Sequence, residues 1–297
     1  MTLKVIDKIK LLFWNLGDKL TPDKENLVEE AIDKISPDIF CISEGTTSIK
    51  NCETIISIFE KKGYHCYYSP LQPDKPYNYN DLGLKIFVKN EELLKGKFEF
   101  NLQREEGRIV ILKTYINFRP TTIILLHCKS LAGSDHSTKE QHIYFVRVKD
   151  MLDLGKVIEN KSNKEIMGEN ERLIIVGDFN IQPWESVLNS KDYLQTTFIA
   201  KHNQIKNRKK NADVFFNPSV EYVINIDKPN LGGTFYSKTH GWAILDYLLY
   251  KTTDGTTSYE IITKFIDGSN LLKEELDKEK DFLNYEIDHL PILITAE

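Results

Sequence analysis

Several short apolar runs in this sequence end in a polar or charged residue, and this pattern constrains the fold more than any other feature. The runs have the length and composition of buried β-strands. A packed sheet fixes the residues at its strand ends and still leaves them reachable, so functional groups tend to collect there. The residues at or just after these ends are Asn15, Glu44, His127, Asp178, Asn180, Asp246, Asp288 and His289.

The N-terminal part of the chain predicts two strand–helix units. Ile9–Asn15 is a mostly apolar run suited to a buried strand, and the apolar residues of 27–35 then recur at helical spacing. That helix should end before Ser36-Pro37, because the residue before a proline avoids helical backbone. Asp38–Ser43 predicts the next strand and Asn51–Lys62 the next helix.

The middle of the chain changes character. Four short runs rich in Ile, Val, Phe and Thr predict the successive strands of a meander, with Pro120-Thr121 between the last two. A helix is expected from Ser137 to about Ile158. The four predicted strands are Leu82–Lys89, Lys97–Leu102, Arg108–Asn117 and Thr121–His127.

Strand patterns return after the predicted helix. Residues 190–230 should hold long loops, and the charged segment 271–281 predicts a solvated helix. Strand–helix units at both ends, with a meander between them, favour a mixed α+β fold in which two sheets pack together inside outer helices. The later strands are Arg172–Gly177, Gly233–Tyr236, Ala243–Tyr250, Tyr259–Phe265 and an edge strand Ile292–Ala296.

Size and composition bound the kind of protein. A chain of 297 residues suits one large domain, here 1–297. No apolar stretch approaches the roughly 20 residues that span a bilayer, so membrane insertion is not expected. Met1–Lys10 lacks the apolar centre of a secretory signal, which predicts a cytoplasmic protein. The four cysteines show no CxxC spacing and are expected to be reduced and packed as small hydrophobes.

Each polar strand end has an ordinary explanation, but the whole set has a chemical one. Taken singly, these residues could be turn residues, a helix cap or a core histidine. Taken together, Glu44 and Asp288 suit a hard cation such as Mg²⁺ (or Mn²⁺), which prefers oxygen ligands. A histidine held by a carboxylate, as Asp246 and His289 could provide, suits proton transfer from water. The remaining pair, Asp178 and Asn180, suits positioning of water and phosphate.

These residues stand in strings that resemble the ordered motifs of the endonuclease/exonuclease/phosphatase superfamily. The match runs in family order from residue 13 to 291, and the Gly-Asp-Phe-Asn string with the terminal Asp-His carries most of its weight. The strings are Phe13-Trp14-Asn15, Ser43-Glu44, Leu126-His127, Gly177-Asp178-Phe179-Asn180, Leu245-Asp246-Tyr247 and Asp288-His289-Leu290-Pro291.

The resemblance implies a four-layer α/β/β/α sandwich with its site at one edge of two facing mixed sheets. It implies that Glu44 binds the metal with Asn15 and Asp288 beside it. It further implies that Asp178 orients or deprotonates the attacking water, Asn180 holds the phosphate and Asp246 pairs with His289. His127 matches the branch of the family that has a catalytic histidine there. The chain departs from the usual family residues at Ser43, Ile244 and Ile287.

Three hypotheses for the function remain open. The first is a nuclease acting on DNA or RNA, because 201–210 is basic and includes Lys206 and Arg208. The net charge of −5 argues mildly against a tight, sequence-blind duplex binder. The second is a phosphatase or phospholipase acting on an inositol phosphate, a sphingolipid or another small phosphate ester; Arg108 could contact phosphate in either case. The third is a binding module without activity, which the complete set of acids and histidines disfavours.

Overall fold

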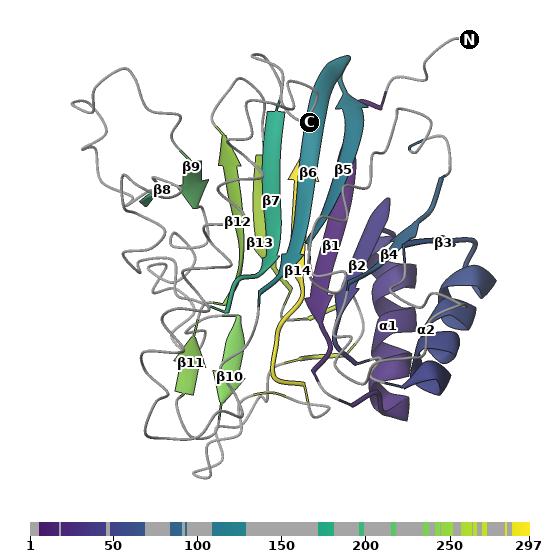
Figure 1. Cartoon of the computed structure of the whole chain (residues 1–297). Helices are drawn as coiled ribbons and strands as arrows, with labels where there is room; N and C mark the ends of the chain where they lie inside the picture. Colours follow the sequence, from purple (N-terminus) through teal and green to yellow (C-terminus); the bar gives the residue numbers. More distant parts are fainter. Residues whose placement is uncertain are drawn as a thin grey trace.

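The structure is a computed structural model, and its longest continuous described ranges are 19–45, 48–68 and 109–128. In full, it describes residues 6–17, 19–45, 48–68, 84–90, 93, 109–128, 172–180, 196–198, 215–217, 234–237, 241–243, 245–251, 257–262, 264–265, 269–271, 283 and 287–297. Two mixed six-stranded sheets pack together within these ranges (Figure 1).

The first sheet joins the two ends of the chain. β14 pairs with β1 on one side and with β13 on the other, while β1 and β2 run parallel. The order is β13-β14-β1-β2-β4-β3. Its strands are β1 (Ile9–Asn15), β2 (Ile39–Ser43), β3 (His65–Tyr68), β4 (Lys85–Val88), β13 (Thr257–Ile261) and β14 (Ile292–Ala296).

The second sheet comes from the middle of the chain. β6 and β7 run parallel, and β12 pairs antiparallel with β7. The order is β5-β6-β7-β12-β9-β8, and a separate pair is formed by β10 (Phe235–Ser237) and β11 (Gly241–Ala243). Its strands are β5 (Ile109–Ile116), β6 (Arg119–His127), β7 (Arg172–Asp178), β8 (Thr196–Phe198), β9 (Phe215–Asn217) and β12 (Asp246–Lys251).

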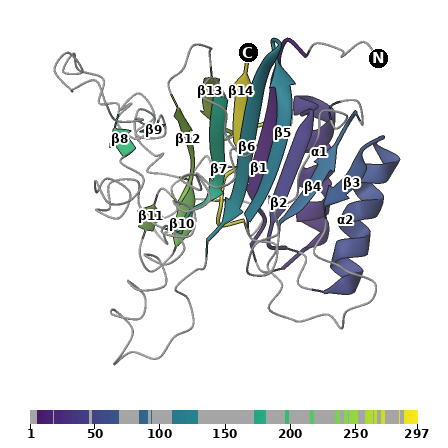
Figure 2. The ribbon, with the colours of Figure 1, turned by 45° about the horizontal axis from the view of Figure 1, so that its top comes forward.

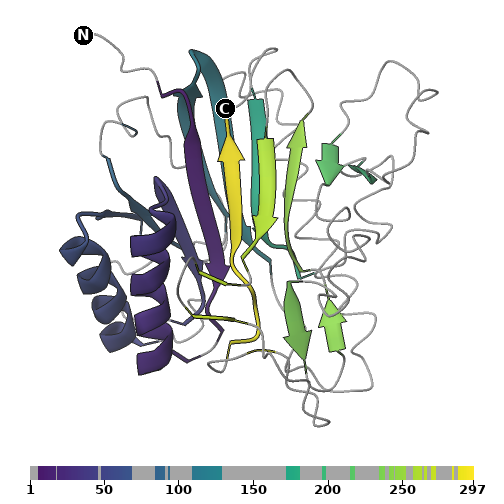
Figure 3. The ribbon, with the colours of Figure 1, turned by 180° about the vertical axis from the view of Figure 1, so that it is seen from behind.

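The core lies between the sheets and beneath two helices. Figures 1 and 2 both show β6 and β7 over β1 and β14, and every residue of β7 is buried. The helices α1 (Pro22–Ile35) and α2 (Ile49–Lys61) cover the face of the first sheet that is turned away from the second (Figure 3). Phe59 of α2 stacks on Phe87 of β4 at 3.8 Å between ring centroids and meets Phe40 of β2 edge-on at 5.0 Å.

Each described helix begins at a side-chain cap. Thr21 and Ser48 have extended backbone, and their hydroxyl oxygens accept hydrogen bonds from the N–H groups of Lys24 and Asn51. Both helices therefore start a few residues earlier than the apolar spacing alone predicts. Within the described ranges, no helix is long and apolar enough to cross a membrane.

The predicted elements are mostly confirmed, including the strand Ile9–Asn15. The expected meander is wrong, because β4 pairs with β2 in the first sheet while β5 and β6 belong to the second. The prediction of Ile292–Ala296 as an edge strand is also wrong, because β14 has a neighbour on both sides. The strand β3 was missed. The predicted strand Lys97–Leu102, the predicted helix from Ser137 and nearly all of 271–281 lie outside the described residues.

The break before β6 comes earlier than predicted. The turn is at Asn117-Phe118, where both residues have positive φ, and Pro120 lies inside β6 opposite Tyr115. The pairing of β6 with β7 begins only at Thr121. Pro120 therefore precedes the stretch paired on both sides, where a missing N–H would remove a ladder hydrogen bond. A second expected strand, Ala243–Tyr250, is divided between β11 and β12.

Candidate active site

The sheet topology brings the polar strand ends to one edge of the sandwich. Because β1 and β2 are parallel, Asn15 and Ser43 lie side by side, and Glu44 follows directly. In the second sheet, the parallel pair β6 and β7 places His127 beside Asp178. β12 and β14 run the opposite way, so Asp246 at the start of β12 lies opposite Asp178, and Asp288 and His289 precede β14 beside the end of β1.

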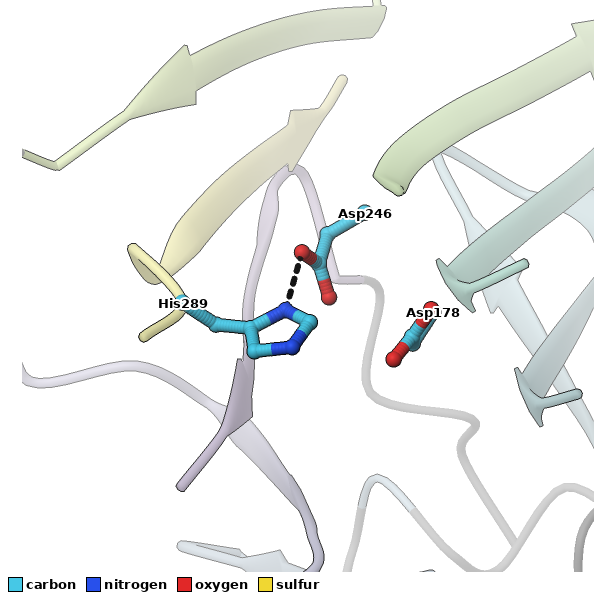
Figure 4. A group of neighbouring side chains, drawn as sticks. All are labelled: Asp178, Asp246 and His289. Atoms are coloured by element: carbon cyan, nitrogen blue, oxygen red, sulfur yellow. Dashed lines mark hydrogen bonds and ion pairs between the residues drawn. The ribbon is translucent and has the colours of Figure 1, made fainter. Parts of the chain in front are cut away.

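A buried histidine–aspartate pair joins the two sheets. His289 Nδ1 is 2.7 Å from Asp246 Oδ2, and both residues are at most 5% exposed (Figure 4). The carbonyl of His289 accepts a hydrogen bond of 3.1 Å from the indole N–H of Trp14. With Nδ1–H donated to the carboxylate, Nε2 is the imidazole atom that remains for substrate or water.

The charge of Asp246 sets the protonation of His289. Burial disfavours the imidazolium, but the charge and hydrogen bond of Asp246, with further help from Asp178, outweigh it and raise the pKa of His289 to about 10. At neutral pH and without a bound cation, the ring is therefore positively charged.

A second set of hydrogen bonds fixes Asp178. Its Oδ2 accepts from Asn15 Nδ2 at 2.9 Å, and its Oδ1 accepts from the backbone N–H of Asn180 at 2.8 Å. Asn180 has a left-handed backbone (φ 52°), and its amide donates to the carbonyl of Cys128 at 2.7 Å. Burial, followed by the charge of Asp246, raises the pKa of Asp178 to about 6. This carboxyl can therefore exchange a proton near neutral pH.

The glycine before Asp178 is required by close packing of the two parallel strands. An ideal Cβ at Gly177 would lie 1.9 Å from the carbonyl oxygen of Leu126 on β6. No side chain fits at that distance. The glycine of the Gly-Asp-Phe-Asn string is thus what lets β7 bring Asp178 beside His127.

Glu44 and His127 form the second histidine–carboxylate pair. His127 Nε2 lies 3.1 Å from Glu44 Oε1 and 3.9 Å from Asp178 Oδ2. Burial raises the pKa of Glu44, but the hydrogen bond and charge of His127 outweigh it and hold the pKa below its usual range. Glu44 also has positive φ (57°), an uncommon backbone for a non-glycine residue that tends to occur at functional sites.

Asp288 lies beside the turn that follows β1. Its Oδ1 is buried and has no hydrogen-bond partner among the described residues. An ideal Cβ on Gly17 would be 2.8 Å from that oxygen, and the N–H of Gly17 donates to Asn15 Oδ1 at 2.9 Å. Asp288 and Asn15 are therefore held around the same glycine. A buried carboxylate oxygen without a donor fits a bound cation.

Two groups of side chains could hold a cation. Ligand atoms of Asp178, Asp246 and His289 all lie within 4.8 Å of one another. However, Nδ1 of His289 is engaged with Asp246, and both oxygens of Asp178 accept hydrogen bonds. Each group contains one buried oxygen without a hydrogen-bond partner in the described part, Asp246 Oδ1 or Asp288 Oδ1. The group of Glu44, Asn15 and Asp288 fits a hard cation better, because all of its ligand atoms are oxygens.

Solved structures with the same architecture match this chain over nearly its whole length. D. rerio TDP2 in complex with a single-strand DNA product is 13% identical, with a TM-score of 0.57, covering 98% of this chain and 99% of that one. The catalytic domain of human Nocturnin is 17% identical (TM-score 0.53; coverage 99% and 95%). An endonuclease/exonuclease/phosphatase family protein from Bacteroides thetaiotaomicron is 14% identical (TM-score 0.54; coverage 97% of each chain).

The chain has the endonuclease/exonuclease/phosphatase fold. By sequence alone, no protein-family model and no curated protein matches it. The expected sandwich of two packed mixed sheets with helices outside is confirmed for the described residues. Among the described residues, the helical layer consists of α1 and α2. The predicted helix from Ser137 lies outside the described ranges.

The structure brings together all eight polar residues expected at the site of this fold, from Asn15 to His289. The tentative substrate contacts Arg108, Lys206 and Arg208 lie outside the described residues. Two of the departures from the family motifs can be placed. The hydroxyl of Ser43 is buried without a hydrogen-bond partner in the described part, and Ile287, only 6% exposed, belongs to the core.

The sequence did not reveal the residues whose hydrogen bonds hold the backbone around the site. Trp14 is part of the string Phe13-Trp14-Asn15, yet the string does not show that its indole N–H donates a hydrogen bond to the carbonyl of His289. The pattern also does not reveal the buried Lys24, whose ammonium donates to the carbonyl of Leu16 at 2.5 Å. An isolated threonine such as Thr234 carries no sequence signal for the two hydrogen bonds that its hydroxyl accepts.

Proposed function

We propose that this chain is a divalent-metal-dependent phosphoesterase that hydrolyses phosphodiester bonds of a nucleic acid. The observation that carries the proposal is the buried pair Asp246–His289 facing Asp178, with the pair Glu44–His127 beside them. Imidazoles and a carboxyl that titrates near neutral pH can transfer protons, and the remaining carboxylates can hold a cation that offsets the charge of a phosphate.

Glu44, Asn15 and Asp288 would hold the divalent cation, Mg²⁺ or Mn²⁺. A cation at these oxygens supplies positive charge that offsets the charge of a phosphate. The unpartnered Oδ1 of Asp288 supports this placement, and so does the lowered pKa of Glu44, which favours its ionised carboxylate. The contact of 3.1 Å between Glu44 Oε1 and His127 Nε2 gives Glu44 a partner when no cation is bound.

Asp178 is the better candidate for the proton acceptor. Its pKa, raised to about 6, is near neutral, whereas His289 is protonated at neutral pH in the cation-free protein. In the proposed reaction, a water oxygen bonds to phosphorus while the bond to the leaving oxygen breaks. Asp178 accepts the proton of the water, and His289 donates a proton to the phosphate or the leaving oxygen. The hydrogen bonds from Asn15 and Asn180 keep Asp178 in place for this transfer.

The nucleic-acid substrate rests on the fold comparison. D. rerio TDP2 has the same fold and is seen with a single-strand DNA product. Single-stranded DNA is therefore the first nucleic acid to test.

The test is cleavage of a substrate panel by the purified chain after removal of metal by a chelator, with Mg²⁺ or Mn²⁺ then added back. The panel contains single-stranded DNA, duplex DNA, RNA, inositol phosphates and sphingomyelin. Asp178→Asn is the inactivated variant. Asp33→Asn is the matched control, because Asp33 is exposed on the outer side of α1 and pairs with Lys62.

Metal-dependent cleavage of a nucleic acid by the wild-type chain and Asp33→Asn, but not by Asp178→Asn, is the expected result. Release of phosphate or phosphocholine with intact nucleic acid would reject a nucleic acid as the substrate, but it would support the assignment as a phosphoesterase. Cleavage that survives both the chelator and Asp178→Asn would reject the proposal as a whole.

A further inference from the structure

The two members of the buried dyad come from different sheets. Asp246 begins β12 of the second sheet, while His289 precedes β14 of the first. Their 2.7 Å contact therefore depends on how closely the backbones of two separate sheets are held. A small shift between the sheets would lengthen the contact without unfolding either sheet.

One residue has hydrogen bonds to both backbones. The hydroxyl oxygen of Thr234 accepts the N–H of Leu245 at 3.1 Å and the N–H of Asp246 at 2.9 Å. The carbonyl of the same residue accepts the N–H of Leu290 at 2.7 Å. Thr234 is fully buried, so water does not offer these groups an alternative partner.

The following residues extend the contact on the histidine side. The N–H of Tyr236 donates to the carbonyl of Asp288 at 2.8 Å, and Phe235 forms an antiparallel bridge with His289. The ring of Phe235 lies 4.7 Å from the imidazole, tilted by 50°. His289 is thus bracketed by backbone hydrogen bonds at both of its neighbours.

We propose that Thr234 is a positioning residue for the Asp246–His289 dyad, and that its hydroxyl fixes the carboxylate relative to the imidazole across the two sheets. The catalytic consequence rests on the proposed function, but the geometric role does not. Tyr259 adds a weaker link, since its hydroxyl donates to the carbonyl of Asp246 at 3.3 Å. Thr234 differs because its hydroxyl and carbonyl together reach both sides of the dyad.

Thr234→Val and Thr234→Ser separate the hydroxyl from the shape of the side chain. Valine keeps the shape but leaves two buried N–H groups without an acceptor, whereas serine keeps the acceptor. Thr121→Val is the matched control. Thr121 is also fully buried, its hydroxyl donates to the carbonyl of Arg119 at 3.2 Å, and it lies at the end of β6 away from His127.

The first measurement is the NMR resonance of the His289 Nδ1 proton, assigned by its loss in Asp246→Asn. A proton held in a short hydrogen bond to a carboxylate appears far downfield and exchanges slowly with water. We expect Thr234→Val to broaden this resonance or shift it upfield, and Thr234→Ser and Thr121→Val to leave it in place. An unchanged resonance in folded Thr234→Val would overturn the proposal.

The second measurement is hydrolysis of the substrate found in the panel assay. Thr234→Val should lower kcat about tenfold or more while KM changes little, Thr234→Ser should restore most of it, and Thr121→Val should match the wild type. An equal loss in both valine variants would show a general effect on stability and reject the positioning role. If the wild-type chain proves inactive on every substrate, the proposed function fails, and the resonance alone still decides the role of Thr234.

Discussion

At the scale of single residues, the site depends on a buried charge that needs a neighbour of opposite charge, because burial disfavours the charged form of a side chain. His289 is a clear case, because burial opposes its positive charge and the Asp246 carboxylate restores it. The pair also affects stability. A histidine with a folded pKa above its unfolded value contributes stability that is fully present below about pH 6.5 and is lost as the pH rises through the folded pKa of about 10.

This dependence predicts the effect of Asp246→Asn on the titration of His289. Removing the carboxylate charge leaves burial as the main influence, so the pKa of His289 should fall by several units and the ring should be neutral at pH 8. NMR of histidine-labelled protein measures this directly for the wild type and the variant. His65, which is exposed on β3, serves as the internal reference. A His289 pKa that is the same in both proteins would contradict the assignment.

A second prediction concerns Gly177. An alanine Cβ would meet the Leu126 carbonyl oxygen at 1.9 Å, so the strands must separate directly beside the pair of His127 and Asp178. This requires a shift of the backbone, because the obstructing atom is not part of a side chain. We expect Gly177→Ala to destabilise the fold by about 3 kcal/mol or more. In Gly63→Ala nothing lies within 4 Å of the new Cβ, and only the positive φ of 78° costs energy, about 1–2 kcal/mol. Chemical denaturation compares the two, and equal losses would contradict this packing argument.

The chemical identity of most site residues could be predicted from the sequence, but their contacts could not. Asp178 and His289 stand out because polar residues interrupt apolar runs. The sequence does not show that Asn15 donates to Asp178, or that His127 lies nearer to Glu44 than to Asp178. Those distances depend on how the two sheets stack, which no local pattern contains.

At the scale of elements, strands were predictable where both faces are buried. The apolar run of β1 reads as a strand from its composition alone, and so does β7. Pairing partners were harder to predict, because β4 follows α2 in the chain yet returns to pair with β2. The position of β14 was misjudged for the same reason. Nothing local shows that β13 covers its outer side.

The interior place of β14 gives a prediction for Thr295. This residue pairs with Lys10 of β1 and Ser258 of β13, so its N–H faces a paired strand whichever way it points. Thr295→Pro should remove a ladder hydrogen bond and cost about 3 kcal/mol or more, whereas Thr295→Ala should cost less than about 1 kcal/mol. Thermal unfolding measures both variants. If proline is tolerated as well as alanine, β14 is not an interior strand.

At the scale of the whole molecule, the fold gathers the titratable groups of the site at one edge of the sandwich. The chain has a formal net charge of −5, and four carboxylates and two imidazoles of the site meet at the edge shared by the two sheets. Of these groups, His127, Asp178, Asp246 and His289 are each at most 5% exposed. The raised pKa of Asp178 reflects burial first and the charge of Asp246 second. Because its folded pKa lies above its usual value, the fold binds that proton more tightly than the unfolded chain, and stability from this group falls as the pH rises from 3.8 to about 6.

A divalent cation should relieve that cost, and the relief should depend on pH. Asp178, hydrogen-bonded to Asn15, is mostly protonated at pH 5 and ionised at pH 8, and a cation favours the ionised form, so Mg²⁺ or Mn²⁺ should raise the melting temperature more at pH 8 than at pH 5. At a concentration 100 times the Kd, the gain is about 2.7 kcal/mol for a single site. Differential scanning fluorimetry at constant ionic strength measures the shift, with Na⁺ replacing the divalent salt as the control. Asp288→Asn should remove most of the shift, while Asp33→Asn should keep it. A shift of equal size at both pH values, or one that survives in Asp288→Asn, would place the cation away from Glu44, Asn15 and Asp288.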